Sequence, residues 1–323
     1  MGRSEIRNIC KVSLDEPAEN QPKLHNRWHP DIPFADTVKN GETVKIECVD
    51  WTGGQISVFA KENGGGFLDE ILPNGRQGHL GFRGHLLFFT TYPTCEVSWI
   101  DTPGNSWLCT LSRGHILEFV IIVAQPPNPQ NVHAGSASQD LKTIVGREGA
   151  RTIPGRPEHG GNCDIKNLSR GSKVYLPVHV KGAKFSVGDL HFSQGDGEIS
   201  FCGAIEMSGV ITINFKVMKN GIADLGMKSP IYLPGPVEPH YGPGRYLTFE
   251  GFSVDHHGKQ HFMDVSVAYR ETILRCIEYL RRFGYSDYQI YLLLSCAPVQ
   301  GHVAGIVDIP NACTTLGLPM DIF

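Results

Sequence analysis

Residues 186–209 read SVGDLHFSQGDGEISFCGAIEMSG, a stretch that combines turn-forming glycines with acidic side chains and one histidine. The Gly-Asp sequences at residues 188–189 and 195–197 are typical of tight turns, because glycine adopts positive φ without steric cost and aspartate hydrogen-bonds its own backbone. Apolar and polar residues alternate after each turn, over residues 190–193 and 198–202. Alternation with a period of two predicts two short strands, and therefore a β-rich structure around this stretch.

The two predicted strands place polar side chains on common faces. At a spacing of two, His191 and Ser193 share one face of the first strand, and Glu198, Ser200 and Cys202 share one face of the second. An imidazole that faces carboxylates can bind a metal ion or transfer a proton. The pattern therefore predicts a functional site; the structural alternative is a hairpin whose acidic residues are solvated.

A second polar cluster favours the functional interpretation. Residues 159–164 read HGGNCD and interrupt otherwise ordinary sequence just upstream. Residues 150–178, ARTIPGRPEHGGNCDIKNLSRGSKVYLPV, and residues 187–209, VGDLHFSQGDGEISFCGAIEMSG, together resemble the acetamidase/formamidase family. The resemblance is to the formamidases of fungi and plants in particular.

This resemblance covers residues 24–56, 61–72 and 126–323. It implies a β-rich α+β fold with a sandwich or barrel core and C-terminal helices. It also implies a hydrolase that converts short linear amides such as formamide to a carboxylate and ammonia. Some relatives bind a metal ion, and the resemblance further implies a homo-oligomer.

The composition limits the partners that the chain can take. It has 323 residues, a formal net charge of −4 and a pI near 6.4, which give no basic field for nucleic acid. No run approaches the ~20 apolar residues of a membrane span, and no apolar leader is present, so we expect a soluble, cytoplasmic protein without membrane contact. The nine cysteines include no CxxC pair, which argues against disulfides and a thiolate zinc site. A small amide substrate remains the expected partner.

The pattern along the chain predicts four regions. These are a polar lead-in over residues 1–23, an N-terminal β region over 24–73 that is truncated relative to the family, an aberrant segment over 74–124, and a β-rich catalytic region over 125–323. The last contains two predicted helices at about 265–295, because apolar residues there recur with helical period.

The aberrant segment and the residues before it depart from the family. The motifs DWTGGQI and KENGGGFLDE are separated in the family by several strands, whereas only residues 57–60 lie between them here. Residues 75–111 resemble nothing in the family. Read one base forward through permitted codons, they give a peptide that begins Ala-Ala-Lys-Ala-Ile and resembles the family segment expected there, so we interpret them as the product of a frameshift or a misassigned intron. A His-Pro-Gly motif of that peptide is replaced here by Thr102-Pro103-Gly104.

Amide hydrolysis requires an activated water, a donor for the developing oxyanion and an acid for the leaving ammonia. A divalent metal ion such as zinc would supply the activated water, because metal-bound water ionises near neutral pH. Asp164 and His191 are its predicted ligands, since they offer oxygen and nitrogen donors. Glu198 is the candidate general base, and Asp196, Asp189 and Gln194 are further catalytic candidates, with Asp189 a possible additional ligand.

Four other residues are candidates for contact with substrate, namely Asn162, Cys202, His29 and Glu250. Cys202 and Cys163 also leave open a cysteine-nucleophile mechanism, since a thiolate beside histidine and backbone donors is reactive. Two further alternatives are a catalytically impaired protein that lacks part of its active site and an enzyme acting on cyclic amides.

Overall fold

A computed structural model describes ten parts of the chain. Within them the architecture is α+β, with several small open sheets and few helices, and no described sheet closes into a barrel. The α+β class expected from the sequence is confirmed; of the expected sandwich or barrel core, no closed barrel is found among these residues. The described residues are 5–13, 15–16, 20–49, 98–102, 106–110, 132–150, 157–159, 164–200, 204–235 and 245–323.

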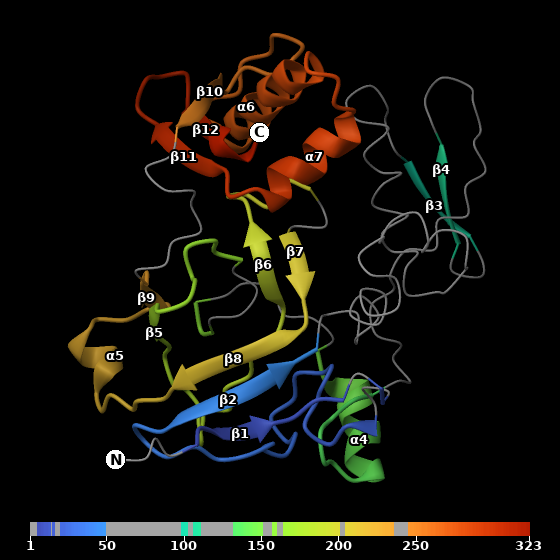
Figure 1. Ribbon diagram of the computed structural model, residues 1–323, viewed down its shortest axis with the longest axis vertical. Coiled ribbons are helices and arrows are strands. Elements are labelled where there is room, and N and C mark those ends of the chain that lie inside the picture. The colour runs from blue at the N-terminus through green and yellow to red at the C-terminus, as the bar shows by residue number, and fades with distance from the viewer. Residues whose placement is uncertain are drawn as a thin grey trace.

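The first sheet joins the start of the chain to its middle. β2 (Thr43–Cys48) pairs antiparallel with β8 (Gly209–Asn214) and parallel with β1 (Arg7–Cys10), giving the order β1-β2-β8 (Figure 1). β2 forms because its residues alternate, and Val44 is fully buried. The lead-in expected for residues 1–23 thus contains a strand, which the polar sequence does not reveal because its partner lies more than thirty residues later.

Two helices and two small two-stranded sheets lie outside the first sheet. α4 (Gln139–Glu148) begins where the Ser138 side chain accepts a hydrogen bond from the backbone N–H of Leu141, and it buries Val145. β5 (Lys173–Tyr175) pairs antiparallel with β9 (Ile231–Leu233). The short helix α5 (Gly221–Asp224) precedes β9 in the chain. Within the aberrant segment, β3 (Ser98–Thr102) and β4 (Ser106–Thr110) form an antiparallel hairpin; the rest of residues 74–124 lies outside the described residues.

A second layer is built from the C-terminal part of the chain. β10 (Tyr246–Phe252), β12 (Cys313–Pro319) and β11 (Gln300–Gly305) form an antiparallel sheet in the order β10-β12-β11, and the chain ends in the 3-10 helix η3 (Met320–Ile322). α6 (Val265–Arg281) lies against β10 and β12, and α7 (Asp287–Cys296) lies against α6. These elements enclose a hydrophobic core whose buried members are Cys276, Ile277, Leu280, Ile290, Leu294, Ala297, Val299, Leu316 and Leu318.

Both helices predicted near the C-terminus are confirmed. Asp264 caps α6, accepting hydrogen bonds from the backbone N–H groups of Ser266 and Val267. Ser286 caps α7 in a capping box with Gln289, as the Ser-x-x-Gln pattern allows. No helix among the described residues is both long and apolar enough to span a bilayer.

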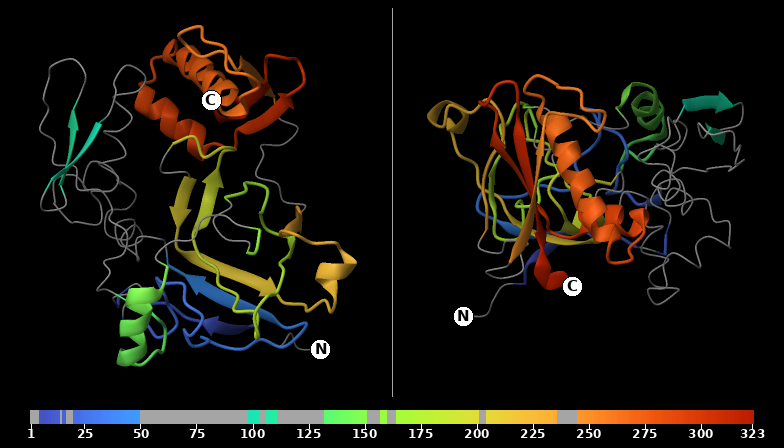
Figure 2. Two further views of the ribbon diagram at one scale, coloured as in Figure 1. Left: turned by 180° about the vertical axis from the view of Figure 1, so that it is seen from behind. Right: turned by 90° about the horizontal axis from the view of Figure 1, so that it is seen from above.

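A hairpin of two strands lies between the two layers (Figures 1 and 2). It consists of β6 (Leu190–Gln194) and β7 (Ala204–Met207), paired antiparallel with a register shift. The prediction of β6 is confirmed, but the prediction of a strand over residues 198–202 is wrong at its described positions, since the second strand begins at Ala204.

The turn after β6 explains the misplaced strand. The backbone N–H of Gly195 donates to the carbonyl of Ser295, and that of Asp196 donates to the carbonyl of Val299. Glu198 has a φ of 39°, which no strand residue adopts. The backbone here therefore bonds to the end of α7 and the start of β11 rather than to a neighbouring strand.

Candidate functional site

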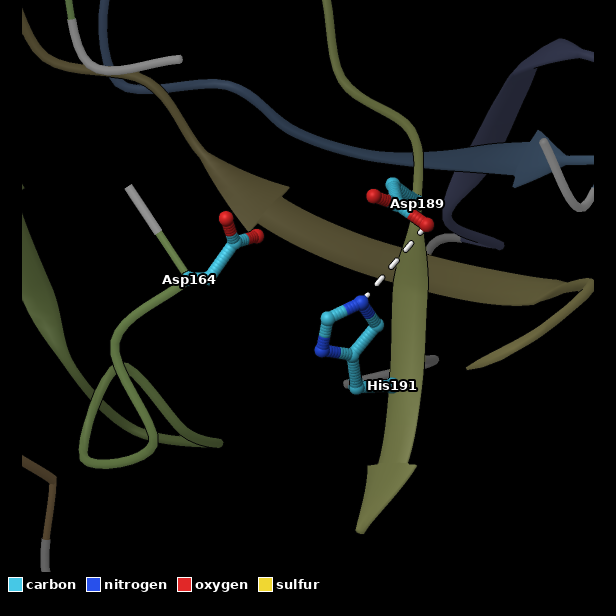
Figure 3. Close-up of side chains that lie close together, drawn as sticks. All are labelled: Asp164, Asp189 and His191. Carbon is cyan, nitrogen blue, oxygen red and sulfur yellow. Dashed lines mark ion pairs between the residues drawn. The ribbon is translucent and has the colours of Figure 1, made fainter. Parts of the chain in front are cut away.

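Three side chains predicted to serve the chemistry converge at the start of β6. One carboxylate oxygen from each of Asp164 and Asp189 and one ring nitrogen of His191 lie within 4.8 Å of one another. Asp164 lies on the far side of the His191 ring from Asp189, where the described chain begins again and continues into residues 165–168 (Figure 3). Both aspartates have positive φ, 35° and 56°, a conformation that aspartate tolerates better than most residues. Local backbone geometry thus directs both carboxylates toward the ring.

The spacing of two of these atoms, one from His191 and one from Asp189, fits a metal ion. His191 Nε2 lies 3.6 Å from Asp189 Oδ1, beyond hydrogen-bond distance, and in the described part of the chain this buried nitrogen has no hydrogen-bond partner. Two ligand atoms at about 2.0–2.2 Å from a tetrahedral ion are about 3.3–3.6 Å apart. Two carboxylates and one imidazole also form the kind of three-ligand set that leaves a position open for water or substrate.

The acidic groups around His191 raise the pKa of its ring. The Asp189 carboxylate facing Nε2 raises the pKa of His191 to about 9, against the opposing effect of burial, and Gln194 contributes further. Without a cation the ring is therefore an imidazolium between acidic groups. A bound cation displaces the proton from the ring, because a metal ion binds the neutral imidazole.

Glu198 completes the acidic side of the site. Its Oε1 lies 4.0 Å from His191 Nδ1, and its side chain is partly buried. Burial, followed by repulsion from the Asp164 carboxylate, raises the pKa of Glu198 to about 7. A carboxylate with a pKa near neutrality suits proton transfer at physiological pH.

The amide of Gln194 connects two members of the site. Its Oε1 lies 2.9 Å from His191 Nδ1, and its Nε2 donates to the backbone carbonyl of Asp164. Gln194 is buried, with 6% of its surface exposed. The predicted catalytic residues Glu198 and Gln194 therefore both adjoin the His191 ring.

Known proteins of one family resemble this chain. The sequence model of the Acetamidase/Formamidase family matches residues 11–58 and 56–323. The chain belongs to this family. It is 54% identical to a putative formamidase of Schizosaccharomyces pombe over 384 aligned positions, covering 98% of this chain and 94% of that protein. It is 40% identical to a formamidase of Methylophilus methylotrophus, again covering 98% and 94%.

Two further relatives extend the family comparison. An acetamidase of Mycolicibacterium smegmatis is 37% identical, covering 86% of each protein. Among solved structures, a gamma lactamase from Delftia acidovorans superposes with a TM-score of 0.72 at 38% identity, covering 98% of this chain and 93% of that one. This acetamidase/formamidase chain thus resembles its relatives over nearly its whole length.

Asp196, predicted as catalytic, has a different set of partners in this family member. Its Oδ2 accepts hydrogen bonds from Lys166 Nζ at 2.9 Å and from the backbone N–H of Gly301 at 3.0 Å. Lys166, which is buried, also donates to the carbonyl of Val299 at 2.8 Å. The Asp196 carboxylate therefore ties the turn after β6 to β11, on the side of the turn that faces the C-terminal layer.

The four predicted substrate-contacting residues are dispersed or not described. His29 lies 3.8 Å from Glu148 at the end of α4, and Glu250 is exposed on β10, opposite Thr315 of β12. Asn162, Cys202 and the alternative nucleophile Cys163 lie outside the described residues.

Lys166 is the one residue of this region that the sequence reasoning missed. It lies two positions after Asp164, just beyond the polar cluster at residues 159–164, where a lysine is usually a solvated residue. Its burial depends on β11, which follows more than one hundred and thirty residues later. A local pattern therefore gives no signal for it.

Proposed function

We propose that this chain hydrolyses short linear amides, formamide in particular, to the carboxylate and ammonia. Membership of the acetamidase/formamidase family and two relatives named as formamidases support this assignment. The observation that carries it is the convergence of Asp164, Asp189 and His191, with the buried Nε2 of His191 lacking a hydrogen-bond partner in the described part of the chain. Such a set of ligands and bases suits metal-assisted hydrolysis of an amide by water.

We propose that Asp164, Asp189 and His191 hold a divalent metal ion such as zinc. When bound, the ion supplies Lewis-acid chemistry, polarising the amide carbonyl and lowering the pKa of water. The distance from His191 Nε2 to Asp189 Oδ1 supports this ligand set. Asp164 and Asp189 are both exposed, so that the open side of the site is accessible to a small substrate.

Glu198 is the proposed general base. It takes a proton from the attacking water as the oxygen bonds to the carbonyl carbon, and returns it to the nitrogen as the C–N bond breaks and ammonia leaves. Its position 4.0 Å from His191 and its raised pKa support this role. We prefer this route to a cysteine nucleophile, because the described site supplies a base and a ligand set without a thiol.

A second candidate substrate class is the cyclic amides. The gamma lactamase from Delftia acidovorans matches nearly the whole chain at 38% identity. A lactam contains the same C–N bond in a ring, so the same groups would serve its hydrolysis, and only the space around the site would differ.

We further propose that the chain lacks a stretch that its relatives possess after Ile56. The alignment with the Schizosaccharomyces pombe relative spans 384 positions, more than the 323 residues of this chain, so it contains positions without a counterpart here. The family model also matches in two blocks that meet at residues 56–58. Activity therefore depends on whether the missing stretch contributes to the site.

The test measures ammonia release from formamide, acetamide and 2-pyrrolidinone by the purified chain, with metal content recorded on the same samples. We expect release from formamide by a zinc-containing protein, and loss of both metal and activity in Asp164→Asn and His191→Gln. Asp140→Asn, an exposed aspartate on α4, is the matched control and should retain both. Full activity in metal-free protein would refute the metal part of the proposal.

A chain that binds metal but releases no ammonia identifies the altered segment as the cause. The decisive comparison then restores residues 75–111 to the other reading frame and inserts the stretch after Ile56 from a relative. Restored activity would establish this chain as an impaired copy of an amidase, and continued inactivity would refute the assignment to amide hydrolysis.

A further inference from the structure

An irregularity in β6 determines which side chains face the site. His191 pairs with Glu206 and Ser193 pairs with Ile205, so that Phe192 has no counterpart on β7. This extra residue is a β-bulge, a feature that re-aims side chains beside functional sites. In a regular strand, residues three apart point to opposite faces. The bulge removes that restriction, and Gln194 contacts the ring of His191 at 2.9 Å.

The orientation of the Gln194 amide follows from its partners. The backbone carbonyl of Asp164 can only accept a hydrogen bond, so the NH₂ group of Gln194 must face it. The amide oxygen is then left for His191 Nδ1, and because an oxygen of this kind only accepts, Nδ1 must carry a hydrogen. The neutral ring therefore presents its lone pair at Nε2, the nitrogen beside Asp189.

We infer that Gln194 is a positioning residue, which fixes the His191 ring with Nε2 as its free nitrogen and ties the Asp164 backbone to that ring. This inference rests on the proposed metal site, because it concerns two of its ligands. This role differs from the catalytic role that the sequence predicted for Gln194. Gln194 is buried, and both ends of its amide are engaged by Asp164 and His191.

The two hydrogen bonds of Gln194 connect two proposed ligands, Asp164 and His191, that are far apart in the chain. Asp164 lies on a loop, and its neighbours 160–163 are outside the described residues, whereas His191 belongs to a strand. A partner that orients a metal-ligating histidine is commonly worth a factor of about 10–100 in metal affinity. Gln194 contacts two proposed ligands, so we expect its removal to weaken metal affinity by a factor near the upper end of this range.

The experiment compares Gln194→Met with Gln289→Met. The methionine at 194 keeps the length of the side chain but loses both hydrogen bonds. Gln289 belongs to the capping box of α7, so its variant loses a side-chain hydrogen bond and some stability at a distance from the site. We expect Gln194→Met to bind Zn²⁺ about 100-fold more weakly in a chelator competition, and Gln289→Met to bind as the unmodified chain does.

A second readout separates positioning from general stability. In ¹⁵N-histidine-labelled protein, the His191 ring, assigned from its loss in His191→Gln, should show a hydrogen on Nδ1 and coupling to bound ¹¹³Cd²⁺ at Nε2. Gln194→Glu keeps an acceptor for Nδ1 and should keep this pattern while weakening Zn²⁺ binding, because its second oxygen faces the Asp164 carbonyl. Gln194→Met should allow both ring forms.

Two outcomes would overturn the inference. One is an unchanged Zn²⁺ affinity in folded Gln194→Met, and the other is a ring in the unmodified protein that carries its hydrogen on Nε2. If the unmodified chain binds no metal, the proposed metal site fails, and the position of the hydrogen on the neutral ring, measured without metal, still decides the role of Gln194. The same measurement decides it if Gln194→Met does not fold.

Discussion

Removing the buried amino group of Lys166 should destabilise the protein substantially. In Lys166→Met the apolar stem is retained, but the Asp196 carboxylate loses its only described charged partner and the Val299 carbonyl loses a hydrogen bond. The Lys166 side chain is 5% exposed and that of Asp196 is 32% exposed. Breaking a fully buried pair costs about 3–5 kcal/mol, and water that reaches the exposed part of Asp196 offsets some of this, so we expect a loss of about 3 kcal/mol in the free energy of unfolding.

Urea denaturation followed by circular dichroism measures this loss, with Lys259→Met as the exposed control, expected within about 0.5 kcal/mol of the unmodified chain. The double variant with Asp196→Asn should recover part of the stability, because the asparagine oxygen still accepts from Gly301 without leaving a charge unpaired. A coupling energy of about 1–3 kcal/mol between the two sites is expected. A Lys166→Met variant as stable as the control would refute the claim that this pair holds the turn after β6.

Two other predictions concern packing and pH dependence. Gly251→Ala should destabilise by about 3 kcal/mol, because a Cβ atom there would lie 2.5 Å from the backbone oxygen of Ala268 on α6; Gly305→Ala, where no atom lies within 4 Å, is the control in the same denaturation assay, and equal effects of the two would contradict the argument. The hydrogen bond from His261 at 2.7 Å lowers the pKa of Asp255 to about 2, below the ordinary value of about 3.9. A lowered folded-state pKa stabilises the protein above pH 4 and loses this effect as pH falls toward 2, so the stability advantage of the unmodified chain over Asp255→Asn should halve by about pH 3 in thermal unfolding; a constant advantage would contradict this.

The elements that the sequence predicted best are those whose signals are local. α6 follows from the helical period of its apolar residues, and α7 from Ser286 at its N-cap. Both signals lie within a few residues of the structure that they specify. The strand expected over residues 198–202 failed for the opposite reason, because Gly195 and Asp196 bond to backbone that follows one hundred residues later.

The contacts of the candidate site also separate into those that local sequence predicts and those that it does not. Asp164 and His191 were expected to act together, and they do lie together, because both belong to polar clusters that the sequence makes conspicuous. The partner of Gln194 could not be foreseen, since strand periodicity places His191 and Gln194 on opposite faces and only the bulge at Phe192 brings them together. Alternation within one strand carries no information on where its register will shift.

The turn after β6 also constrains when this protein can mature during synthesis. Its backbone bonds to Ser295 and Val299, and the Asp196 carboxylate bonds to Gly301. A nascent chain that has emerged only as far as α6 has β6, β7 and the contacts of Lys166 and Tyr269 with Asp196, yet it lacks the backbone partners of Gly195 and Asp196, which follow α6. Long-range closure of this kind slows folding and leaves partly formed strands exposed in the interval. Residues that follow α6 therefore complete the candidate site, after its proposed ligands Asp164, Asp189 and His191 have already been synthesised.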